Sequence, residues 1–353
     1  MKMNITGLML VTITTLLFTG CAQKVRVKAL DPAEVGEMAS KKKVAIVDFK
    51  NDTVGLSGKI EAEIAKQKLD KKRYFTVLSR KDLASVMAEQ KLQSSELLDA
   101  TTASKVGVLI GAQAMVNGEI SSANAESGTY KEDKKECLSY YKDGGGCAKW
   151  RFYKVTCQTT QAAVAANINI VDVENGSIIY ADTISKDYSG DSCKAGKTSL
   201  GLLVLDTGPK KILSKQQALN KLTADIANEF VYKLSPHYIY FNVALLDSIE
   251  IETSDANHLA LENSLKYIKG GRMDKADKIL NKLMEDTDGK SYVVAYVYGV
   301  VKEAQGQFDE AKDLYSIADD LTTEPVSEVN LAVTRIEKLI SKRDEARAQI
   351  NKK

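Results

Sequence analysis

The segment from Gln161 to Lys186, QAAVAANINIVDVENGSIIYADTISK, constrains the fold most, because alternating runs flank Asn175-Gly176. Asn-Gly is the strongest short signal for a β-hairpin, since a type I′ turn needs positive φ at both central residues. A two-residue loop would place Glu174 opposite Ser177. One face would then carry Ala162, Val164, Ala166, Ile168, Ile170, Ile179, Ala181 and Thr183. Since the other face is mixed, we expect helices on one side only.

The chain before this hairpin alternates between short apolar runs and helical patterns. We expect strands at Val44–Phe49, Tyr74–Leu78 and Ala112–Ser121, and helices at Lys59–Leu69, after Ser79 and at Thr101–Leu109. Ser79 is a predicted helix N-cap, with Asp82 at the capping-box position. An amphipathic helix over Lys211–Leu234 closes the domain. This order predicts an α+β fold: a mixed β-sheet with helices packed mainly on one face.

The N-terminus has the pattern of an export signal. Residues 1–20 contain a charged start, an apolar run from Leu8 to Phe18, and Thr19-Gly20 directly before Cys21. This run is too short to remain as a spanning helix. The pattern resembles a bacterial lipoprotein signal, with Phe18 where such signals prefer Leu. The resemblance implies lipidation of Cys21 and, because Ala22 follows it, the outer membrane. The alternative is an ordinary secretory signal with an unrelated cysteine.

Charge and motif content argue against nucleic-acid binding and catalysis. With 49 basic and 47 acidic residues, the net charge is only +2, whereas nucleic-acid binding favours a strong basic excess. His237 and His258 have no partners at metal-ligand spacing. The segment 190–198 resembles a phosphate-binding loop but has five residues, not four, before Gly196-Lys197. We therefore predict no enzyme activity, no cofactor and no metal site.

The strand and helix segments VAIVDF, RYFTVLSRKDLASVMAEQ, GAQAMVNGEI and NINIVDVENGSIIYADTISK resemble the curli assembly/transport (CsgG-like) lipoprotein family. The resemblance covers Val44 to about Leu234. It implies a fold more than a task, because the family includes a ring-shaped outer-membrane secretion channel and also periplasmic assembly factors. In the channel, each subunit adds two amphipathic hairpins to a shared β-barrel.

The two insertion sites that the resemblance implies lie at residues 126–157 and 186–210. A membrane strand needs about 9–11 alternating residues with one apolar row. The first insertion is dense in charge and alternates only over Ala148–Tyr153, and the second contains an unbroken LGLLVL. We therefore favour an assembly factor over a channel.

Both insertions contain cysteines: Cys137, Cys147, Cys157 and Cys193. An even number in an exported chain indicates two disulfides. Extended hairpin strands with one bulge would bring Cys157 opposite Cys193, which leaves Cys137 to pair with Cys147. A four-thiolate zinc site is the alternative, but it would need close CxxC pairs.

Aromatic residues crowd the same segment. The candidate partner-binding residues there are Tyr140, Tyr141, Trp150, Phe152 and Tyr153, with Tyr130 nearby. Tyr and Trp are favoured anchors of protein interfaces. The alternative is that these rings form a small core beneath the disulfides.

The chain after Leu246 is helical in pattern, and it contains a repeat. GRMDKADKIL from Gly271 matches GQFDEAKDLY from Gly306 at an offset of 35 residues. This resembles tetratricopeptide repeats, whose concave surface binds peptides, so Tyr298 and Phe308 become further partner-binding candidates. A helical bundle with a chance repeat is the alternative.

Together these patterns predict a signal peptide (1–20), a polar tether (21–43), a CsgG-like domain (44–247) and an all-α helical domain (248–353). The predicted protein is a non-catalytic outer-membrane lipoprotein facing the periplasm, which scaffolds assembly of an envelope or secreted structure. Its expected partners are envelope proteins or secreted subunits, with the membrane reached through the lipid and a homo-oligomer possible. The alternative is a curli-type channel subunit. An enzyme is a third, disfavoured class.

Overall fold

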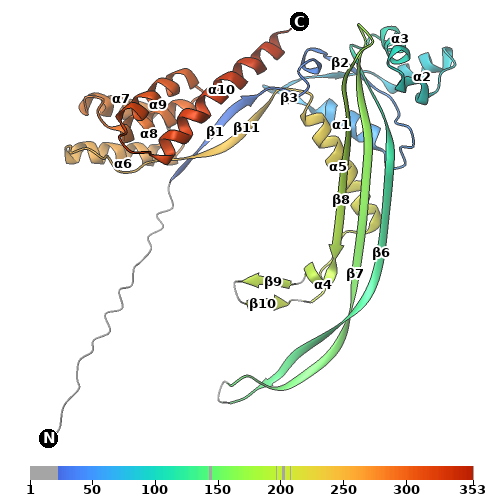
Figure 1. Cartoon of the computed structure of the whole chain (residues 1–353), viewed down its shortest axis with the longest axis horizontal. Coiled ribbons are helices and arrows are strands. Elements are labelled where there is room, and N and C mark those ends of the chain that lie inside the picture. The colour runs from blue at the N-terminus through green and yellow to red at the C-terminus, as the bar shows by residue number, and fades with distance from the viewer. Residues whose placement is uncertain (1–22, 143–144, 196, 201–202, 207, 353) are drawn as a thin grey trace. The chain divides into compact units, whose positions relative to one another are not determined.

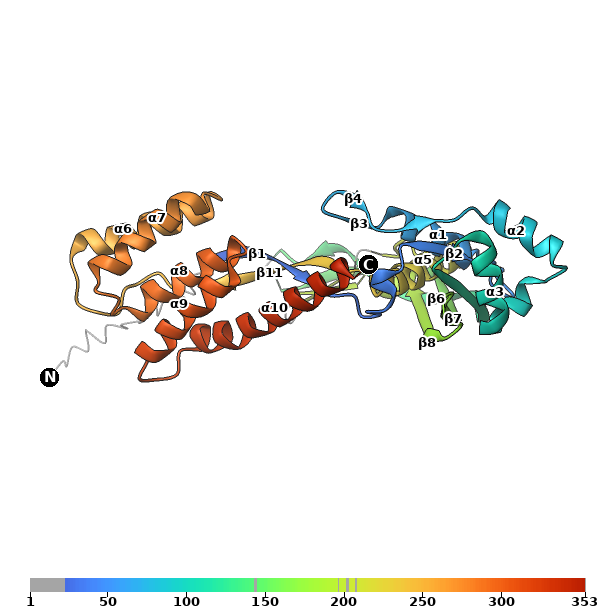
Figure 2. The same cartoon turned by 90° about the horizontal axis from the view of Figure 1, so that it is seen from above.

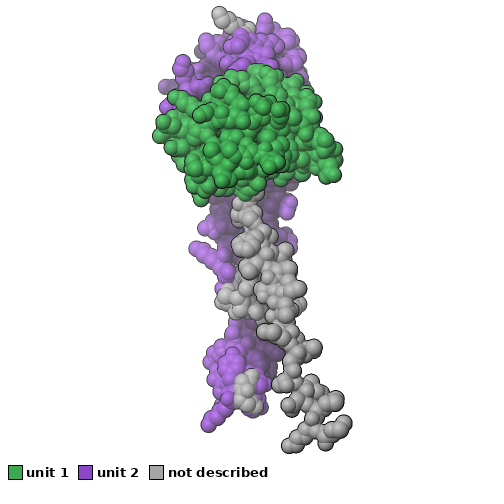
Figure 3. Space-filling model, turned by 90° about the vertical axis from the view of Figure 1, so that its left-hand side faces the viewer, with its two compact units in different colours: residues 1–29, 238–341 green, residues 30–237, 342–353 purple. Residues whose placement is uncertain are grey.

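The computed structural model describes residues 23–142, 145–195, 197–200, 203–206 and 208–352. Two compact units divide the chain, and each is assembled from separate stretches of sequence (Figure 3). Unit 1 comprises residues 1–29 and 238–341, and unit 2 comprises residues 30–237 and 342–353. The predicted signal peptide and Cys21 lie outside the described residues.

Unit 2 is built on a five-stranded mixed sheet with the order β5-β2-β6-β7-β8. Its strands are β2 (Lys43–Ile46), β5 (Thr76–Val77), β6 (Ala114–Tyr140), β7 (Cys147–Asp172) and β8 (Ile178–Asp191). β2 runs parallel to both of its neighbours, whereas β6, β7 and β8 form an antiparallel meander. The longest strands continue far beyond the helices (Figure 1).

The helices of unit 2 create a hydrophobic core on each face of the sheet. α1 (Leu56–Lys66) and α5 (Lys215–Tyr232) pack on the face that carries Ile168 and Ile170. α2 (Arg80–Glu89) and α3 (Ala100–Ile110) cover the opposite face near Val171. The predicted α+β class is confirmed, but the expectation of helices on one side only is wrong, because α2 and α3 pack on the second face. The predicted cap is also present, because the Ser79 hydroxyl accepts a hydrogen bond from the Lys81 N–H.

Short elements complete unit 2. They are β3 (Lys68–Leu69) paired with β4 (Lys72–Arg73), α4 (Ser192–Ala195), and β9 (Lys197–Leu200) paired with β10 (Leu203–Asp206). The last three lie in the second predicted insertion. The helix predicted over Lys211–Leu234 begins only at Lys215, because Ser214 and Gln217 form a capping box there.

The β7–β8 connection corrects the predicted two-residue turn. The Asp172 N–H donates to the Ser177 carbonyl (2.8 Å), and the Gly176 N–H donates to the Asp172 carbonyl (2.9 Å). Gly176 has a φ of +68°, but Asn175 is not in the positive-φ region, so a type I′ turn is not formed. The longer loop shifts the register, and Ile170 lies opposite Tyr180 instead of Ala181.

This shift changes which residues of β8 face the helices. Ala166 pairs with Ile184, and Ile184 is buried in the α1–α5 core, whereas Ala181 and Thr183 are exposed. The prediction of which β8 side chains face the helices was therefore wrong, because the strand is shifted by one residue from its predicted register. A one-residue slip exchanges the two faces of a strand, since side chains alternate with a period of two.

Unit 1 is a helical array with a two-stranded ribbon on it. The ribbon pairs β1 (Lys24–Asp31) with β11 (His237–Ala244). The helices are α6 (Asp255–Lys269), α7 (Met273–Asp286), α8 (Tyr292–Ala304), α9 (Phe308–Leu321) and α10 (Ser327–Asn351), whose last residues belong to unit 2. Figure 2 shows α6 beside α7 and α8 beside α9. None of the helices in the described residues is both apolar and long enough to cross a membrane.

The sequence repeat corresponds to equivalent positions in the helical array. Gly271 and Gly306 both have positive φ, and each lies two residues before the first residue of its helix, α7 or α9. Gly299 of α8 is required by packing, because a Cβ there would lie 2.6 Å from the Tyr315 ring on α9. The small residue thus permits the close approach of two helices. The predicted all-α C-terminal region is confirmed.

The segment predicted as a polar tether is ordered structure from Lys24 onward. Val25, Val27 and Ala29 of β1 are buried against unit 1, and Met38 is buried in unit 2. The alternation KVRVKA is a weak strand signal, because only three of its residues are apolar and each is flanked by a basic residue. Three alternating apolar residues are enough for a strand of a two-stranded ribbon, because only one of its faces is buried.

Candidate docking surface on the β6–β7 hairpin

β6 and β7 continue as a two-stranded ribbon after β8 ends. The last β7–β8 pair joins Thr159 to Asp191, whereas β6 and β7 stay paired as far as Tyr140 and Cys147. The unaccompanied ribbon is therefore roughly 40 Å long at about 3.3 Å per residue. Figure 1 shows it projecting past the helices of unit 2. We use the name distal ribbon for residues 129–157.

Cross-strand charges explain why this polar sequence forms strands. The Arg151 guanidinium forms an ion pair with Glu136, and Lys154 Nζ lies 3.4 Å from Asp133 Oδ1. Lys135 Nζ lies 4.8 Å from the centre of the Trp150 ring. Opposite charges across an antiparallel pair stabilise a sheet even when both faces are solvated. In the sequence, only residues 148–153 alternate between apolar and polar side chains, so an apolar row does not indicate this continuous pairing.

A disulfide closes the end of the distal ribbon. Cys137 and Cys147 are joined, with their Cα atoms 5.7 Å apart. The second bond joins Cys157 of β7 to Cys193 of α4 at the base of the ribbon. Both bonds have the pairing preferred from the sequence. They explain why this ribbon can hold one conformation without a helix packed on it.

The base of the distal ribbon has a further anchor at Asp191. The Tyr130 hydroxyl donates to both oxygens of this carboxylate (3.1 and 2.9 Å), and the Cys193 and Lys194 N–H groups donate to Oδ1. Burial acts to raise the pKa of Asp191, but the hydrogen bonds from Lys194, Tyr130 and Cys193 outweigh it and lower the pKa. Burial and the Asp191 charge raise the pKa of Tyr130.

The predicted aromatic residues of the distal ribbon are exposed, so they do not form a small core. Their exposed fractions are 72% for Tyr140, 57% for Tyr141, 46% for Trp150, 74% for Phe152 and 39% for Tyr153. Trp150 and Phe152 share one face, opposite Cys137 and Lys135, whereas Tyr153 lies on the other face opposite Lys134. We use the name aromatic strip for Trp150 and Phe152.

The two candidates in the helical array differ from these rings. Phe308 is only 3% exposed and Tyr298 only 8%, and both belong to the hydrophobic core of unit 1. The Tyr298 hydroxyl donates to Asn281 Oδ1 (3.3 Å). Tyr298 and Phe308 are therefore core residues, and the exposed candidates all lie on the distal ribbon.

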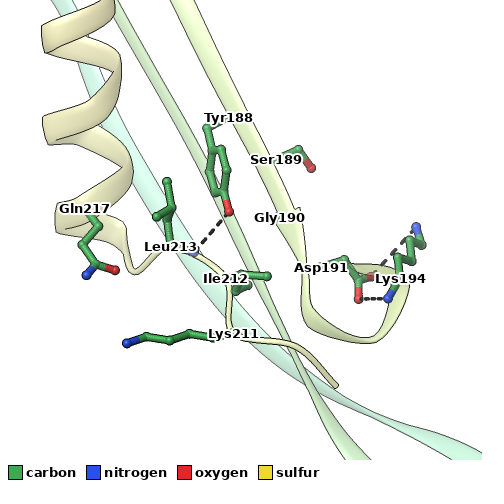
Figure 4. A pocket seen from close by; sticks show the side chains of 9 residues that line it. All are labelled: Tyr188, Ser189, Gly190, Asp191, Lys194, Lys211, Ile212, Leu213 and Gln217. Carbon is green, nitrogen blue, oxygen red and sulfur yellow. Dashed lines mark hydrogen bonds and ion pairs between the residues drawn. The ribbon is translucent and has the colours of Figure 1, made fainter. Parts of the chain in front are cut away.

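A groove beside the ribbon base was not anticipated from the sequence. It has a volume of about 640 Å³ and is bounded by the end of β8, by Lys194 and by residues 211–213 before α5 (Figure 4). The Leu213 N–H donates to the Tyr188 hydroxyl (3.1 Å), which closes one wall. The residues that line the groove come from two stretches of sequence, 188–194 and 211–217. No local sequence pattern therefore indicates the groove.

One group of potential metal ligands occurs at the ribbon base. Glu132, Cys157 and Cys193 place their ligand atoms within 4.8 Å of one another. Both cysteines are held in the disulfide, and a disulfide offers no thiolate to a metal ion. In the described part of the chain, the two sulfur atoms of this group therefore form a structural disulfide and are not thiolate ligands for zinc.

Comparison with known proteins yields one family. The family model "Curli production assembly/transport component CsgG" matches residues 26–239. Structural likenesses are weak. The chain is similar to the LpoB C-terminal domain from Salmonella enterica (14% identity, TM-score 0.26, covering 44% of this chain and 95% of that one). It is also similar to the PelC dodecamer from Paraburkholderia phytofirmans (11%, 0.23, 58% and 94%). A search of curated proteins returns no match.

Proposed function

The chain belongs to the CsgG family of curli production assembly/transport components, and from this premise we propose that it is a non-catalytic assembly factor of the bacterial envelope. It is anchored by a lipid on Cys21 to the outer membrane, faces the periplasm and docks on an envelope or secreted protein through the distal ribbon. The observation that carries the proposal is the exposed aromatic strip on a disulfide-closed ribbon.

Exposure of these rings supports docking. Phe152 keeps 74% and Trp150 46% of its surface in water, and large aromatic side chains dominate the binding energy of protein interfaces. Lys135 lies beside the Trp150 ring, which favours a partner surface with acidic groups at its rim. Because the disulfide already fixes the ribbon, little conformational freedom is lost on binding.

A secretion channel is the second candidate function, because the distal ribbon is long enough for it. A strand that crosses a bilayer needs about 9–11 residues, and one row of its side chains must be apolar. Here charged residues occupy both faces: Asp133, Lys135 and Lys154 on one, and Glu136 and Arg151 on the other. This distribution favours docking over membrane insertion. Single-channel conductance of the purified protein in planar bilayers would support the channel instead.

Photocrosslinking in intact cells tests the docking proposal. A photoreactive phenylalanine analogue replaces Phe152 in one strain and Leu331 in another, since Leu331 is also exposed (63%) but lies on α10. We expect a discrete adduct with an envelope or secreted protein from position 152 only. Trp150→Ala should weaken the complex at least about 30-fold, because the truncation of an interface anchor costs about 2 kcal/mol or more.

The matched control for this truncation is Leu259→Ala, which removes a comparably exposed apolar side chain (54%) from α6. It should leave the adduct unchanged. Equal adducts from positions 152 and 331, or equal effects of the two alanine variants, would contradict docking through the aromatic strip. The anchor is tested separately by mass spectrometry of the mature N-terminus, where an unmodified Cys21 would contradict the lipid.

A further inference from the structure

The outer face of the β1–β11 ribbon carries only basic, aromatic and neutral polar residues at its exposed positions. Lys24, Arg26 and Lys28 are exposed on β1, and Tyr240 and Asn242 are exposed on β11. The alternate residues of β1, from Val25 to Ala29, are buried against the helices of unit 1. The ribbon therefore has one face fixed in the core and one basic face in water. We use the name basic face for Lys24, Arg26, Lys28, Tyr238 and Tyr240.

Two of the three cations of the basic face, Arg26 and Lys28, lie over tyrosine rings. The Arg26 guanidinium carbon is 4.4 Å from the centre of the Tyr240 ring, and Lys28 Nζ is 3.5 Å from that of Tyr238. Within the described chain, no carboxylate forms an ion pair with Lys24, Arg26 or Lys28. The tyrosine rings thus hold the charges of Arg26 and Lys28 in place. Since no carboxylate of the described chain neutralises these three cations, they remain available to an external anion.

The position of the basic face in the chain limits what it can meet. Only Ala22 and Gln23 separate Cys21 from Lys24, and consecutive Cα atoms are about 3.8 Å apart. Lys24 is therefore within about 11 Å of Cys21 whatever path the chain takes. If Cys21 carries the lipid, as proposed above, the basic face begins at the membrane surface.

We propose that the basic face binds the anionic phospholipid headgroups of the membrane in which Cys21 is anchored. Lysine and arginine near a membrane are attracted to anionic lipids, and each contributes about 1 kcal/mol, which is roughly a fivefold change in partitioning. Tyrosine prefers the interfacial region, where its ring is apolar and its hydroxyl is wet. A basic patch beside a lipid anchor adds an electrostatic contribution to the membrane attachment that the lipid provides.

Vesicle co-sedimentation tests this proposal without the lipid. The mature chain carrying Cys21→Ser is mixed with vesicles of phosphatidylcholine alone, or of phosphatidylethanolamine with phosphatidylglycerol. We expect binding to the anionic vesicles only, weakening as salt rises from about 0.05 to about 0.5 M. The triple variant Lys24→Gln, Arg26→Gln, Lys28→Gln should lower the partition coefficient at least about 100-fold.

A matched triple variant shows whether the position of the removed charges matters, or only the change in net charge. Lys269→Gln, Lys278→Gln, Lys282→Gln removes the same charge from exposed positions of α6 and α7. It should change partitioning less than about threefold. Equal loss in both triple variants, equal binding to neutral vesicles, or binding to peptidoglycan sacculi instead of vesicles would overturn the proposal. An unmodified Cys21 in cells would contradict the anchor, whereas this vesicle assay reports on the basic face alone.

Discussion

At the scale of single residues, Asp191 fixes the base of the distal ribbon. Its carboxylate accepts hydrogen bonds from Tyr130 and from two backbone N–H groups of α4, and these bonds lower its pKa below the ordinary 3.8. Because the folded-state pKa is lower than the unfolded one, the ionised carboxylate stabilises the fold above about pH 4. That stability is lost as the pH falls through the folded-state pKa.

We therefore expect Asp191→Asn to lower the thermal midpoint at neutral pH and to lose its effect in acid. Wild type and variant are compared by circular dichroism from about pH 7 to about pH 2. The difference should be constant above about pH 5 and should vanish towards pH 2. Tyr130→Phe, which removes one of the three donors, should show a smaller difference over the same range. A difference independent of pH would contradict the role of the ionised carboxylate.

At the scale of elements, the two disulfides close loops of very different length. Cys137 and Cys147 are 10 residues apart, whereas Cys157 and Cys193 are 36 apart. In the chain-entropy account, the longer loop restricts the unfolded state more. Cys157 and Cys193 are also fully buried, and their bond ties α4 to the sheet.

We expect removal of the Cys157–Cys193 bond by paired alanine substitution to lower the free energy of unfolding by about 4 kcal/mol. The same change at Cys137 and Cys147 should cost about 3 kcal/mol or less, since the ribbon end packs on no helix. Urea unfolding of both variants measures the two costs. A larger loss from the distal pair would show that the ribbon end belongs to the cooperative core of unit 2.

At the scale of the whole molecule, the C-terminal residues complete a unit that begins near the N-terminus. Gln349 Oε1 accepts from the Ala33 N–H (2.8 Å), and its Nε2 donates to the Ala33 carbonyl (3.1 Å). Both residues are buried in unit 2. Ala33 and Gln349 are 316 residues apart in the sequence. Unit 2 is therefore complete only when the last turns of α10 are present.

We expect Gln349→Ala to lower the free energy of unfolding by about 2 kcal/mol, because it leaves a buried N–H and a buried carbonyl without partners. Arg347→Ala, at an exposed position of the same helix, should change it by less than about 0.5 kcal/mol. Urea unfolding followed by circular dichroism gives both values. Equal effects would mean that helix propensity, and not the bond to Ala33, links the C-terminus to unit 2.

Local patterns were sufficient for much of the fold. The Ser79 cap needs only a hydroxyl before an apolar stripe, and Leu222, Ile226 and Phe230 are buried in α5 as their spacing predicts. The cysteine pairing was also predictable, since it depends on count, compartment and an approximate register. For the candidate site, the residue types indicated that the aromatic rings of the distal ribbon are exposed. They did not indicate that Trp150 and Phe152 lie on one face of the ribbon and Tyr153 on the other.

The sequence by itself determined the identity and order of most elements, because these follow from periodicity and from residues close together in the chain. The cysteine partners followed from the number of cysteines and an approximate hairpin register, and the family followed from the resemblance of the strand and helix segments. Only the tertiary structure decided the register of β8, the ordered β1 and the burial of Tyr298 and Phe308. Each of these depends on which distant segment packs against the residue. The packing of distant segments is decided by the total hydrophobic surface that the whole chain buries. A short stretch of sequence does not contain that information.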